Sequence, residues 1–496
     1  MIVIGGGPVG ENAAARTAAG GLRTALVEAE RVGGECSYWA CMPSKALLRP
    51  GHALAAARRV PGVPVGARLD PVEVLKRRNG FTSDWDDSGQ VEWAEGAGLT
   101  VVRGRGRLVG ERRVDVDGRV LTATKAVVVC TGSVPRIPSL PGLSDVPYWT
   151  SREATSAQEV PSSLVVLGGG VVGVEMAQAW ARLGSDVTLV VSGERPLPKF
   201  EAFAGDLVAE GLREDGVRLV TGVKAVGVST SDGSGGAGGS GGSAGDGGSA
   251  GDGGSAGDGG SAGDGGSAGD GGSGGAQVSL RLSDDSVVTG AHLLIATGRQ
   301  PATFDLGVEQ FGFTAGEALE VDDTGRVSGV DWLYAAGDVT GRALLTHQGK
   351  YAARAVGTAI VTGATDPEPW TAPVATADHT AVPQVVFTDP EVASVGWSEA
   401  QAREAGLEIR VVDLDIAVAG SSLHADGYRG KARMIVDERK RTLVGVTFAG
   451  PDVAELIHAA TIAIVGEVTV DRLWHAVPAY PTISEVWLRL LEAYGL

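Results

Sequence analysis

Two stretches of the chain share one order of apolar and small residues. In the first, the apolar run IVI (2–4) leads into GGGPVG, an alanine-rich stretch and a second apolar run, RTALVEA. The second stretch, residues 164–192, repeats this order with LVVL, GGGVVG, VEMAQAWARLG and SDVTLVV. Short apolar runs bounded by glycine are typical of buried parallel strands, and the segment between two such strands is typically a helix. Each stretch therefore predicts a β-α-β unit, and together they predict two doubly wound domains of the α/β class.

The C-terminal part, residues 371–496, follows a different pattern. Strand-like runs come first (QVVF, SVGW, ARMIVD and TLVGVTFAG), and helical runs follow (ELIHAATIAIVGE and SEVWLRLLEAYGL). Strands followed by helices, rather than alternating with them, are typical of an α+β domain with helices on one face of a sheet. We therefore expect a third domain of a different kind at this end of the chain.

A low-complexity tract interrupts the pattern at residues 231–276. Its core is the hexapeptide SAGDGG, repeated five times from Ser243 to Gly272. The tract has no β-branched or aromatic residue that could form a core, so its composition predicts disorder. Calcium-binding β-roll repeats are the alternative, but they need an apolar residue that SAGDGG lacks. Because strand-like runs flank the tract, we interpret it as an extended hairpin tip and not as a domain boundary.

Composition and charge narrow the class of protein. The chain has 496 residues, enough for three or four domains, and its 42 basic and 60 acidic side chains give a net charge of −18. Without a lysine- or arginine-rich run, such a chain is a poor partner for nucleic acid or an anionic membrane. No apolar stretch reaches the length of about 18 residues that a membrane span needs, and no basic leader precedes the first strand. We expect a cytoplasmic protein with no nucleic-acid or membrane partner.

The three cysteines, Cys36, Cys41 and Cys130, are too few for a disulfide scaffold. In a reducing compartment, a close pair is more often catalytic or metal-binding than structural. A metal site needs three or four ligands, and no His or Cys cluster joins this pair, so we expect no metal. The alternative is two unrelated buried thiols.

The spacing of Cys36 and Cys41 limits their geometry. On one ideal helix, five positions at about 100° each would set the two side chains about 140° apart. For the sulfurs to meet, Cys36 must precede the helix whose start Pro43 indicates, or the first turn of that helix must be distorted. A thiol close to a helix N-terminus has its thiolate form favoured.

Both glycine-rich turns have the spacing G-x-G-x-x-G, at Gly5, Gly7 and Gly10 and again at Gly168, Gly170 and Gly173. The first glycine makes the tight turn, the second lets the backbone reach a pyrophosphate, and the third lets helix and strand approach. The helix N-terminus then favours the phosphate charge. After the first turn, Glu28 closes the second strand and can accept ribose hydroxyls. The context predicts dinucleotide binding, with an ordinary tight turn as the alternative.

The second dinucleotide site differs at the end of its second strand. There, Val191 and Ser192 stand where a carboxylate would favour NAD, and Arg195 follows closely. An arginine in the absence of that carboxylate favours the 2′-phosphate of NADP, although Glu194 weakens the preference. We therefore expect NADPH as the cofactor, with NADH as the alternative.

Taken together, the motifs resemble those of the class I pyridine nucleotide–disulfide oxidoreductases, which include glutathione reductase, lipoamide dehydrogenase and mercuric reductase. In chain order they are VIGGGPVG, GGECSYWACMPSK, CTGSVPRIPSLPG, GGGVVGVEMA, IATGRQP, LYAAGDVTG with LTHQGKYAAR, VVFTDPEVASVG and YPTISE. The resemblance covers the chain except the insert at 231–276. It implies an FAD-binding domain from residues 1–148 and 292–371, an NAD(P)-binding domain at 149–291 and a dimerisation domain at 372–496.

The resemblance also implies roles for single residues. Lys45 and Glu175 would form an ion pair beside the flavin, Cys41 would be the thiol next to the flavin, and Cys36 would exchange with the acceptor. Hydride would pass from NADPH to FAD, then to the Cys36–Cys41 disulfide, and then to a disulfide or other soft electrophile. Beyond the first glycine turn and Glu28, FAD would be held by Thr131, Gly132, Gly298, Gly337 and Asp338. The nicotinamide cofactor would lie along Gly168 to Glu175, Ser192 and Arg195.

The chain departs from the family pattern at Tyr480. Disulfide reductases of the family have His-Pro-Thr with a Glu five residues after the His, whereas this chain has Tyr480, Pro481, Thr482 and Glu485. Histidine can give and take a proton near neutrality, but tyrosine, with a pKa of about 10, is a poor base. Glu485 therefore lacks its usual partner, and exchange with a small disulfide should be slowed. His475 is the remaining substitute candidate, although a histidine at that distance is more often a surface residue.

Neither subgroup that shares part of this departure fits the chain. The soluble transhydrogenases carry a similar tyrosine but lack the first cysteine, whereas Cys36 is present here. Mercuric reductases lack the histidine but carry a C-terminal cysteine pair, and this chain ends EAYGL. Val171 stands where members similar to glutathione reductase place a gating tyrosine.

Four hypotheses about function therefore stay open. The first is reduction of a disulfide or soft electrophile through the dithiol, and the second is reduction of quinones directly from the flavin. The third is hydride exchange between NADH and NADP, and the fourth is a non-catalytic FAD-bound protein. In the family, the counterpart of YPTISE reaches the active site of the partner subunit, so the resemblance implies a homodimer.

Overall fold

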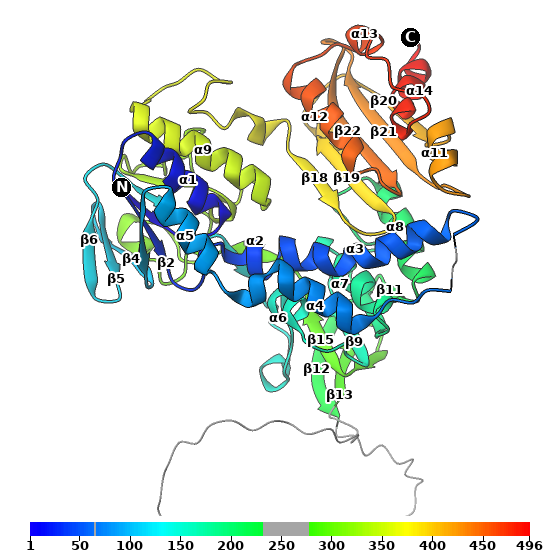
Figure 1. The fold of residues 1–496 in the computed structure, drawn as a ribbon, viewed down its shortest axis with the longest axis horizontal. Coiled ribbons are helices and arrows are strands. Elements are labelled where there is room, and N and C mark those ends of the chain that lie inside the picture. Colours follow the sequence, from blue (N-terminus) through cyan, green and yellow to red (C-terminus); the bar gives the residue numbers. More distant parts are fainter. Residues whose placement is uncertain (64–65, 232–276) are drawn as a thin grey trace, which may run out of the picture.

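The computed structural model describes residues 1–63, 66–231 and 277–496 (Figure 1). Its first parallel sheet has the strand order β17-β7-β1-β2-β3. These strands are β1 (Ile2–Ile4), β2 (Thr24–Glu28), β3 (Leu99–Arg103), β7 (Val127–Val129) and β17 (Leu333–Ala335). β1 pairs with β2 on one side and with β7 on the other, so the N-terminal apolar run is the central strand.

Both faces of this sheet are covered. On one face, α1 (Pro8–Ala19), α5 (Ser88–Gly96) and α9 (Thr346–Thr362) share a core with Val3 and Leu26. On the other face lies the small antiparallel sheet of β4 (Gly106–Gly110), β5 (Arg113–Val116) and β6 (Arg119–Thr122), which packs against Ile2 and Ile4. Strands buried on two sides need apolar residues at successive positions, which explains the uninterrupted runs in the sequence.

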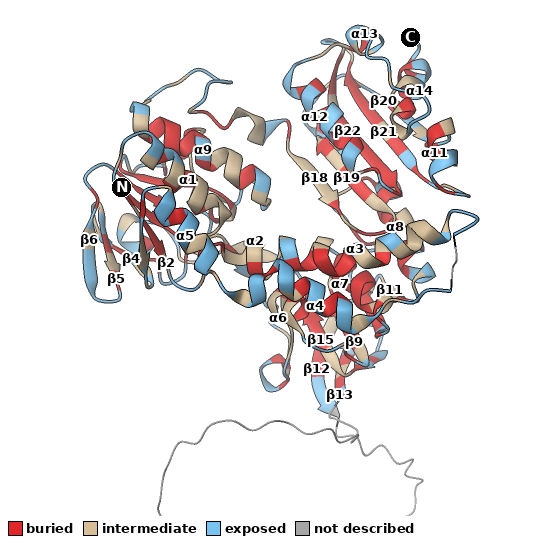
Figure 2. Cartoon of the chain, in the orientation of Figure 1, coloured by how far each residue is buried: buried red, intermediate tan, exposed pale blue. Residues whose placement is uncertain are grey.

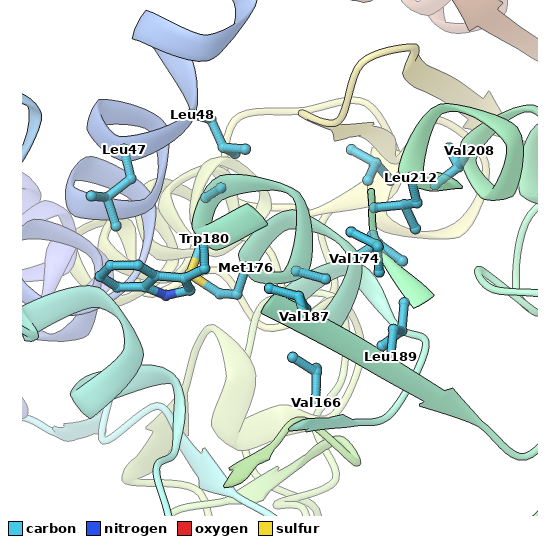
Figure 3. Packing of buried hydrophobic residues seen from close by; sticks show 14 of the residues in the cluster. Leu47, Leu48, Val166, Val174, Met176, Trp180, Val187, Leu189, Val208 and Leu212 are labelled. Atoms are coloured by element: carbon cyan, nitrogen blue, oxygen red, sulfur yellow. The ribbon is translucent and has the colours of Figure 1, made fainter. Parts of the chain in front are cut away.

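The second parallel sheet confirms the β-α-β unit expected at residues 164–192. It has the order β11-β10-β9-β15, formed by β9 (Ser163–Leu167), β10 (Asp186–Val191), β11 (Arg218–Thr221) and β15 (His292–Ile295). The crossover helix α7 (Val171–Arg182) buries Met176 and Trp180, which lie in one hydrophobic cluster with Leu47 (Figure 3). β15 begins at residue 292, where the sequence analysis expects the second part of the FAD-binding domain to begin. Because β15 pairs with β9, that boundary separates two strands of one sheet.

The low-complexity tract sits in a hairpin. β12 (Ala225–Ser231) and β13 (Gln277–Leu282) pair antiparallel across it, and β14 (Val287–Gly290) completes a three-stranded sheet. This pairing agrees with the hairpin interpretation of the flanking runs. The repeats themselves, for which the sequence predicts disorder, fall within residues 232–276, outside the described residues.

The C-terminal region is an antiparallel sheet with helices packed on it, as expected for an α+β domain. Its order is β18-β19-β22-β21-β20, formed by β18 (Pro383–Val386), β19 (Glu391–Gly396), β20 (Ile409–Asp415), β21 (Lys431–Asp437) and β22 (Thr442–Gly450). Figure 2 shows β19, β21 and β22 largely buried, and their core includes residues of α12 (Ile457–Val465) and α14 (Val486–Tyr494). Within the described ranges, no helix has the length and apolarity needed to cross a membrane.

Two consecutive helices connect these regions. α2 (Gly34–Tyr38) follows the first glycine turn, and the long α3 (Cys41–Arg58) runs from it across α7 (Figure 1). The backbone breaks between them at Ala40, whose φ and ψ are −128° and −97°. The remaining elements are α4 (Pro71–Phe81), α6 (Ser151–Ser156), α8 (Ala202–Glu214), α10 (Glu399–Glu404), α11 (Ala419–His424), α13 (Val470–Leu473), β8 (Ser133–Pro135), β16 (Arg299–Pro301) and short 3-10 turns.

Candidate active site

The first glycine turn joins β1 to α1 and leaves the helix N-terminus open. Gly5 has a φ of 100°, and a Cβ there would lie 2.4 Å from the carbonyl oxygen of Cys130. A Cβ at Gly10 would lie 1.8 Å from the carbonyl oxygen of Gly5, so this glycine lets the helix reach the strand. A Cβ at Gly7 would meet nothing closer than Gly34 Cα at 3.8 Å. Since no side chain caps α1 among the described residues, its first amides are free to hold a phosphate group.

The second glycine turn has the same geometry at the start of α7. Gly168 has a φ of 121°, and a Cβ there would lie 2.4 Å from the carbonyl oxygen of Ala296. A Cβ at Gly173 would lie 1.8 Å from the Gly168 oxygen, whereas a Cβ at Gly170 would meet nothing within 4 Å. The two turns therefore fit two dinucleotides, because each combines a close strand–helix approach with open space before a helix N-terminus.

Glu28 ends β2 beside the first turn. Its carboxylate accepts hydrogen bonds from the amides of Gly6 at 2.6 Å and Glu30 at 2.7 Å. Burial raises the pKa of Glu28, and these two amide hydrogen bonds oppose that change. The carboxylate is thus held at the position where the fingerprint expects an acceptor for ribose hydroxyls.

Asp338 is fixed by a chain of polar contacts. The Ser133 hydroxyl donates to Asp338 Oδ2 at 2.5 Å, and Arg299 Nε donates to the Ser133 hydroxyl oxygen at 2.7 Å. Burial raises the pKa of Asp338, and the Ser133 hydrogen bond and the Arg299 charge oppose this rise. The neighbouring Gly337 has a φ of 80° and packs against Val9 of the first turn, so the Asp338 segment adjoins the start of α1.

The loop at Thr131 lies at the end of β7, next to the first glycine turn. The Thr131 hydroxyl donates to the Ala302 carbonyl oxygen at 2.8 Å. Gly132 and Gly298 both have positive φ values, 74° and 122°, and a Cβ at either position would meet nothing within 4 Å. Both loops thus face open space at the carboxyl ends of strands, which is where doubly wound folds bind their ligands.

Cys36 and Cys41 meet because they belong to different helices. Cys36 lies in α2, and Cys41 begins α3 directly after the break at Ala40. Of the two arrangements that the spacing left open, this is the one in which Cys36 precedes the helix that has Pro43 in its first turn. Both cysteines are free thiols that are hydrogen-bonded to each other, and Cys41 Sγ lies 3.2 Å from the Thr346 hydroxyl oxygen.

The surroundings of the pair favour a thiolate at Cys41. Its pKa is lowered first by the hydrogen bond from Cys36, and the Thr346 hydroxyl and the Lys45 charge add to this effect against the opposing effect of burial. Cys41 is also the first residue of α3, where the free helix amides favour negative charge. The arrangement can therefore hold one reduced sulfur as an anion, which is what thiol–disulfide chemistry needs.

Lys45 and Glu175 form an ion pair between α3 and α7. Lys45 Nζ lies 2.8 Å from Glu175 Oε2, and the other carboxylate oxygen accepts from the Phe387 amide at 3.0 Å. The Glu175 side chain is buried, so removing Lys45 would leave a buried carboxylate without its counter-charge. This contact joins the start of the dithiol helix, the second glycine-turn helix and the C-terminal region.

At the strand end expected to select the nicotinamide cofactor, the positive charge of Arg195 is partly neutralised by an ion pair. Ser192 and Glu194 are exposed after β10, while Val191 packs beside Gly169. Arg195 Nε lies 2.9 Å from Asp206 Oδ1 of α8, and both side chains reach solvent. Arg195 is thus available near the strand end, but a 2′-phosphate would have to compete with Asp206 for it.

Tyr480 and Glu485 lie apart from the dithiol in this single chain. Tyr480 is 76% exposed, and His475 lies on the same exposed segment. Glu485 is buried and accepts from Arg489 Nη2 at 3.0 Å through Oε1, while its Oε2 has no partner among the described residues. The sequence analysis found no histidine to pair with Glu485. In the structure, its carboxylate pairs with Arg489 instead. Val171 occupies the position at which members similar to glutathione reductase have a gating tyrosine. It is the first residue of α7, and its side chain is half-buried.

A cavity of 390 Å³ lies where α2, α4 and α5 meet. It is lined by Ser37, the residue after Cys36, and by Gln90, whose side-chain amide donates to the Ser37 hydroxyl at 3.2 Å. Asp86 and the exposed aromatic rings of Phe81 and Trp93 also line it. Few-hundred-Å³ cavities with a small number of polar groups are typical of small-molecule sites.

Several residues of this site were missed by the sequence analysis. Thr346 belongs to LTHQGKYAAR, a segment used only as a whole for the resemblance, and its contact with Cys41 joins positions far apart in the chain. Ser133 and Arg299, which hold Asp338, likewise lie in motifs that were read only for their glycines and threonine. The sequence signal that could have indicated these residues was their position within a recognised motif. Their contacts could not be inferred from the sequence, because they form only in the fold.

The chain has two glycine turns of the dinucleotide-binding type, and a thiol pair lies on α2 and α3, between them in the sequence. This combination defines a nucleotide-dependent oxidoreductase of the dithiol class. The chain belongs to the pyridine nucleotide-disulphide oxidoreductase family. Residues 1–245 and 266–368 match the family's main domain, and residues 382–490 match its dimerisation domain. It is therefore an FAD-dependent enzyme that uses NAD(P)H, and the hypothesis of a non-catalytic protein is set aside.

Known relatives cover the chain from end to end. A dihydrolipoyl dehydrogenase of Thermus scotoductus is 31% identical over 99% of this chain and 96% of its own length. A mercuric reductase of Staphylococcus aureus is 27% identical over 98% of this chain and 80% of its own length. The solved structure of the HOCl-induced flavoprotein disulfide reductase RclA from Escherichia coli matches with a TM-score of 0.77 and 25% identity, covering 99% of both chains.

Proposed function

We propose that the chain passes reducing equivalents from NADPH through FAD to a Cys36–Cys41 disulfide, and from there to a disulfide or other soft electrophile. The observation that carries this proposal is the position of two free thiols at the break between α2 and α3, where Cys41 begins a helix and its sulfur lies 3.2 Å from the Thr346 hydroxyl oxygen. An enzyme that did not use its dithiol would not need a threonine hydroxyl, a lysine and a helix N-terminus at one sulfur. FAD, when bound, supplies the hydride and two-electron chemistry that the protein side chains lack.

The residues around the cofactor sites support this proposal by holding groups in place. The two glycine turns would bind the pyrophosphates of FAD and the nicotinamide nucleotide, and Glu28 would bind a ribose. Asp338, fixed by Ser133 and Arg299, would bind FAD beyond its pyrophosphate. The ion pair of Lys45 with Glu175 fixes a positive charge beside Cys41, which keeps the anionic sulfur stable.

The exchange with an acceptor disulfide takes two steps. In the first, Cys36 gives up its proton and its sulfur attacks one acceptor sulfur; a Cys36–acceptor S–S bond forms, and the other acceptor sulfur leaves with the electron pair and takes up a proton. In the second, the Cys41 thiolate attacks Cys36, the Cys36–Cys41 disulfide forms, and the second acceptor thiol leaves and is protonated.

We also propose that the enzyme is a homodimer. The family match covers a dimerisation domain, and that domain exposes large apolar side chains on the single chain. These are Leu423, Ile462, Val465, Trp474 and Val477, together with Tyr480. Exposed large apolar side chains favour association with a partner.

An anaerobic titration of the purified flavoprotein with NADPH tests the dithiol route. We expect an intermediate with a long-wavelength charge-transfer band, since a Cys41 thiolate would lie beside oxidised flavin, and full reduction should need two equivalents of NADPH. The measurement is the visible spectrum after each addition. Bleaching of the flavin by one equivalent, with no such band, would show that the dithiol is bypassed.

The nucleotide preference can be tested at Arg195. We expect Arg195→Ser to lower kcat/KM for NADPH by about 10-fold, mostly through KM, because a charge-assisted hydrogen bond to the 2′-phosphate is lost. The same variant should leave kcat/KM for NADH nearly unchanged. Asp206→Asn is the matched control, because it frees Arg195 from its ion pair and should improve the use of NADPH. Equal losses with both nucleotides would contradict the assignment.

Direct reduction of quinones from the flavin is the second candidate function. It is favoured by Tyr480, which cannot act as a base near neutrality, and by Glu485, which is already paired with Arg489. An acceptor that takes hydride or electrons from the flavin needs no proton donor at the dithiol. Exchange between NADH and NADP stays a third hypothesis, which a direct nucleotide-exchange assay would test.

A further inference from the structure

The helix that carries Cys36 is too short to hold its own position. α2 has five residues, it follows Gly33 and Gly34 with φ values of 108° and 56°, and no side chain caps it among the described residues. Helices of this length are unstable in water on their own, so contacts with other elements must fix it. The placement of the Cys36 sulfur therefore depends on the side chains that hold the residues on either side of it.

Two side chains of α6 contact the residues that flank Cys36. Arg152 Nε donates to Oε1 of Glu35, which precedes Cys36. The same guanidinium lies over the ring of Trp39, with its central carbon 4.2 Å from the ring centre. The Thr155 hydroxyl oxygen lies 2.9 Å from the carbonyl oxygen of Trp39. Because a guanidinium is planar, such contacts fix orientation as well as distance, and they do so on both sides of Cys36.

α6 is itself fixed at both ends. Thr150 and Glu153 form a capping box at its start, and the backbone of Trp149, directly before it, pairs with β15 of the second parallel sheet. At its other end, the fully buried Arg78 of α4 donates to the carbonyl oxygen of Thr155. α6 lies between α2 and the sheet that contains β15 (Figure 1). It can therefore hold the thiol helix in a fixed place relative to that sheet.

Further contacts on α2 come from the segment that precedes β3. Trp85 Nε1 donates to the carbonyl oxygen of Tyr38 at 3.1 Å, and the Gln90 side-chain amide donates to the Ser37 hydroxyl at 3.2 Å. Both contacts lie on the C-terminal half of α2 and do not depend on α6. Loss of Arg152 should therefore shift α2 relative to α3 without unfolding it.

We propose that Arg152 is a positioning residue for the dithiol. By holding α2 on both sides of Cys36, it keeps this thiol within disulfide-forming reach of Cys41. The inference rests on the proposed use of the pair as a redox-active disulfide. A disulfide forms only when the two Cβ atoms lie about 3.5–4.5 Å apart, so a shift of α2 relative to α3 disfavours the oxidised state. Arg152 acts through α2 and takes no part in the bond changes.

The equilibrium between the dithiol and the disulfide of the FAD-loaded enzyme tests this role. The enzyme is equilibrated with mixtures of reduced and oxidised dithiothreitol, at ratios that keep the flavin oxidised. The remaining thiols are then alkylated and counted by mass spectrometry. In this exchange, Cys36 and Cys41 give two protons and two electrons to the cyclic disulfide of dithiothreitol, which opens to its dithiol. We expect Arg152→Met to lower the equilibrium constant for disulfide formation by about 10-fold, because a displaced pair has a lower effective concentration.

The direction of the shift separates positioning from charge. Removing a cation disfavours a thiolate, which only the reduced state has, so a purely electrostatic role would make the disulfide more favourable in Arg152→Met. Trp39→Leu removes the ring beneath the guanidinium without changing the charge, and it should lower the constant as well. Arg152→Lys keeps the charge and should recover part of the loss. Arg429→Met is the matched control, because Arg429 pairs with Glu210 and Glu214 of α8, and it should leave the constant unchanged.

An equilibrium constant that is unchanged or higher in Arg152→Met would overturn the inference, and so would an equal loss in Arg429→Met. If Arg152→Met does not retain FAD, Trp39→Leu decides by the same criterion. A parent enzyme that forms no Cys36–Cys41 disulfide at any ratio would overturn the proposed function together with the inference. The two failures are therefore distinguishable, because only the second is seen in the parent enzyme.

Discussion

Replacing Cys41 with serine is expected to abolish disulfide reduction while leaving reduction of quinones or redox dyes largely intact. Serine cannot form the Cys36–Cys41 disulfide, so reducing equivalents have no route to Cys36, and turnover with a disulfide should fall by about 10³-fold or more. An acceptor that reacts at the flavin does not need this route. Steady-state rates with a small disulfide and with a quinone, measured on the same preparation, give the two values directly.

The control for this experiment is the third cysteine. Cys130 is fully buried beside the first glycine turn, and burial raises its pKa to about 12, so it is a poor nucleophile. Cys130→Ala should therefore keep both activities, provided that the FAD content is unchanged. If Cys41→Ser retains disulfide reduction, the dithiol route is wrong. If the parent enzyme reduces quinones and no disulfide, the second candidate function replaces the first.

The parts of the site that the sequence predicts are those in which local backbone geometry dictates the residue. The turns at Gly5 and Gly168 need a positive φ and a close approach that only glycine allows, so they can be recognised without a structure. The break between Cys36 and the helix begun by Cys41 is one of the two arrangements that helix geometry allows for this spacing, so it too could be anticipated as an alternative. Such constraints act between neighbours in sequence, where spacing alone carries the information.

The parts that the sequence does not predict depend on contacts between distant segments. Thr346 meets Cys41, and Arg489 takes up the carboxylate of Glu485, with no local pattern that requires either contact. The pairing of β15 with β9, across the boundary expected at residue 292, is another contact that only the fold shows.

Replacing Tyr480 with histidine is expected to raise the rate of disulfide reduction. An imidazole can give and take a proton near neutrality, and this kind of catalysis contributes about 10²–10⁴-fold in enzymes, so we expect a gain of about 10²-fold at pH 7.5. Glu485 still has Oε2 buried without a partner among the described residues, and this oxygen can accept from the new imidazole. The measurement is kcat/KM for a small disulfide as a function of pH, in which the gain should diminish below pH about 6.5 as the imidazole protonates.

Two further variants separate the chemistry from the packing. Tyr480→Phe keeps the ring and removes the hydroxyl, so equal rates in this variant and the parent enzyme would show that the phenol does not serve as a proton donor. Arg489→Met in the Tyr480→His background frees the second oxygen of Glu485, which should increase the gain if the carboxylate orients the imidazole. If Tyr480→His reduces disulfides no faster while its quinone rate is unchanged, protonation at this position does not limit the enzyme.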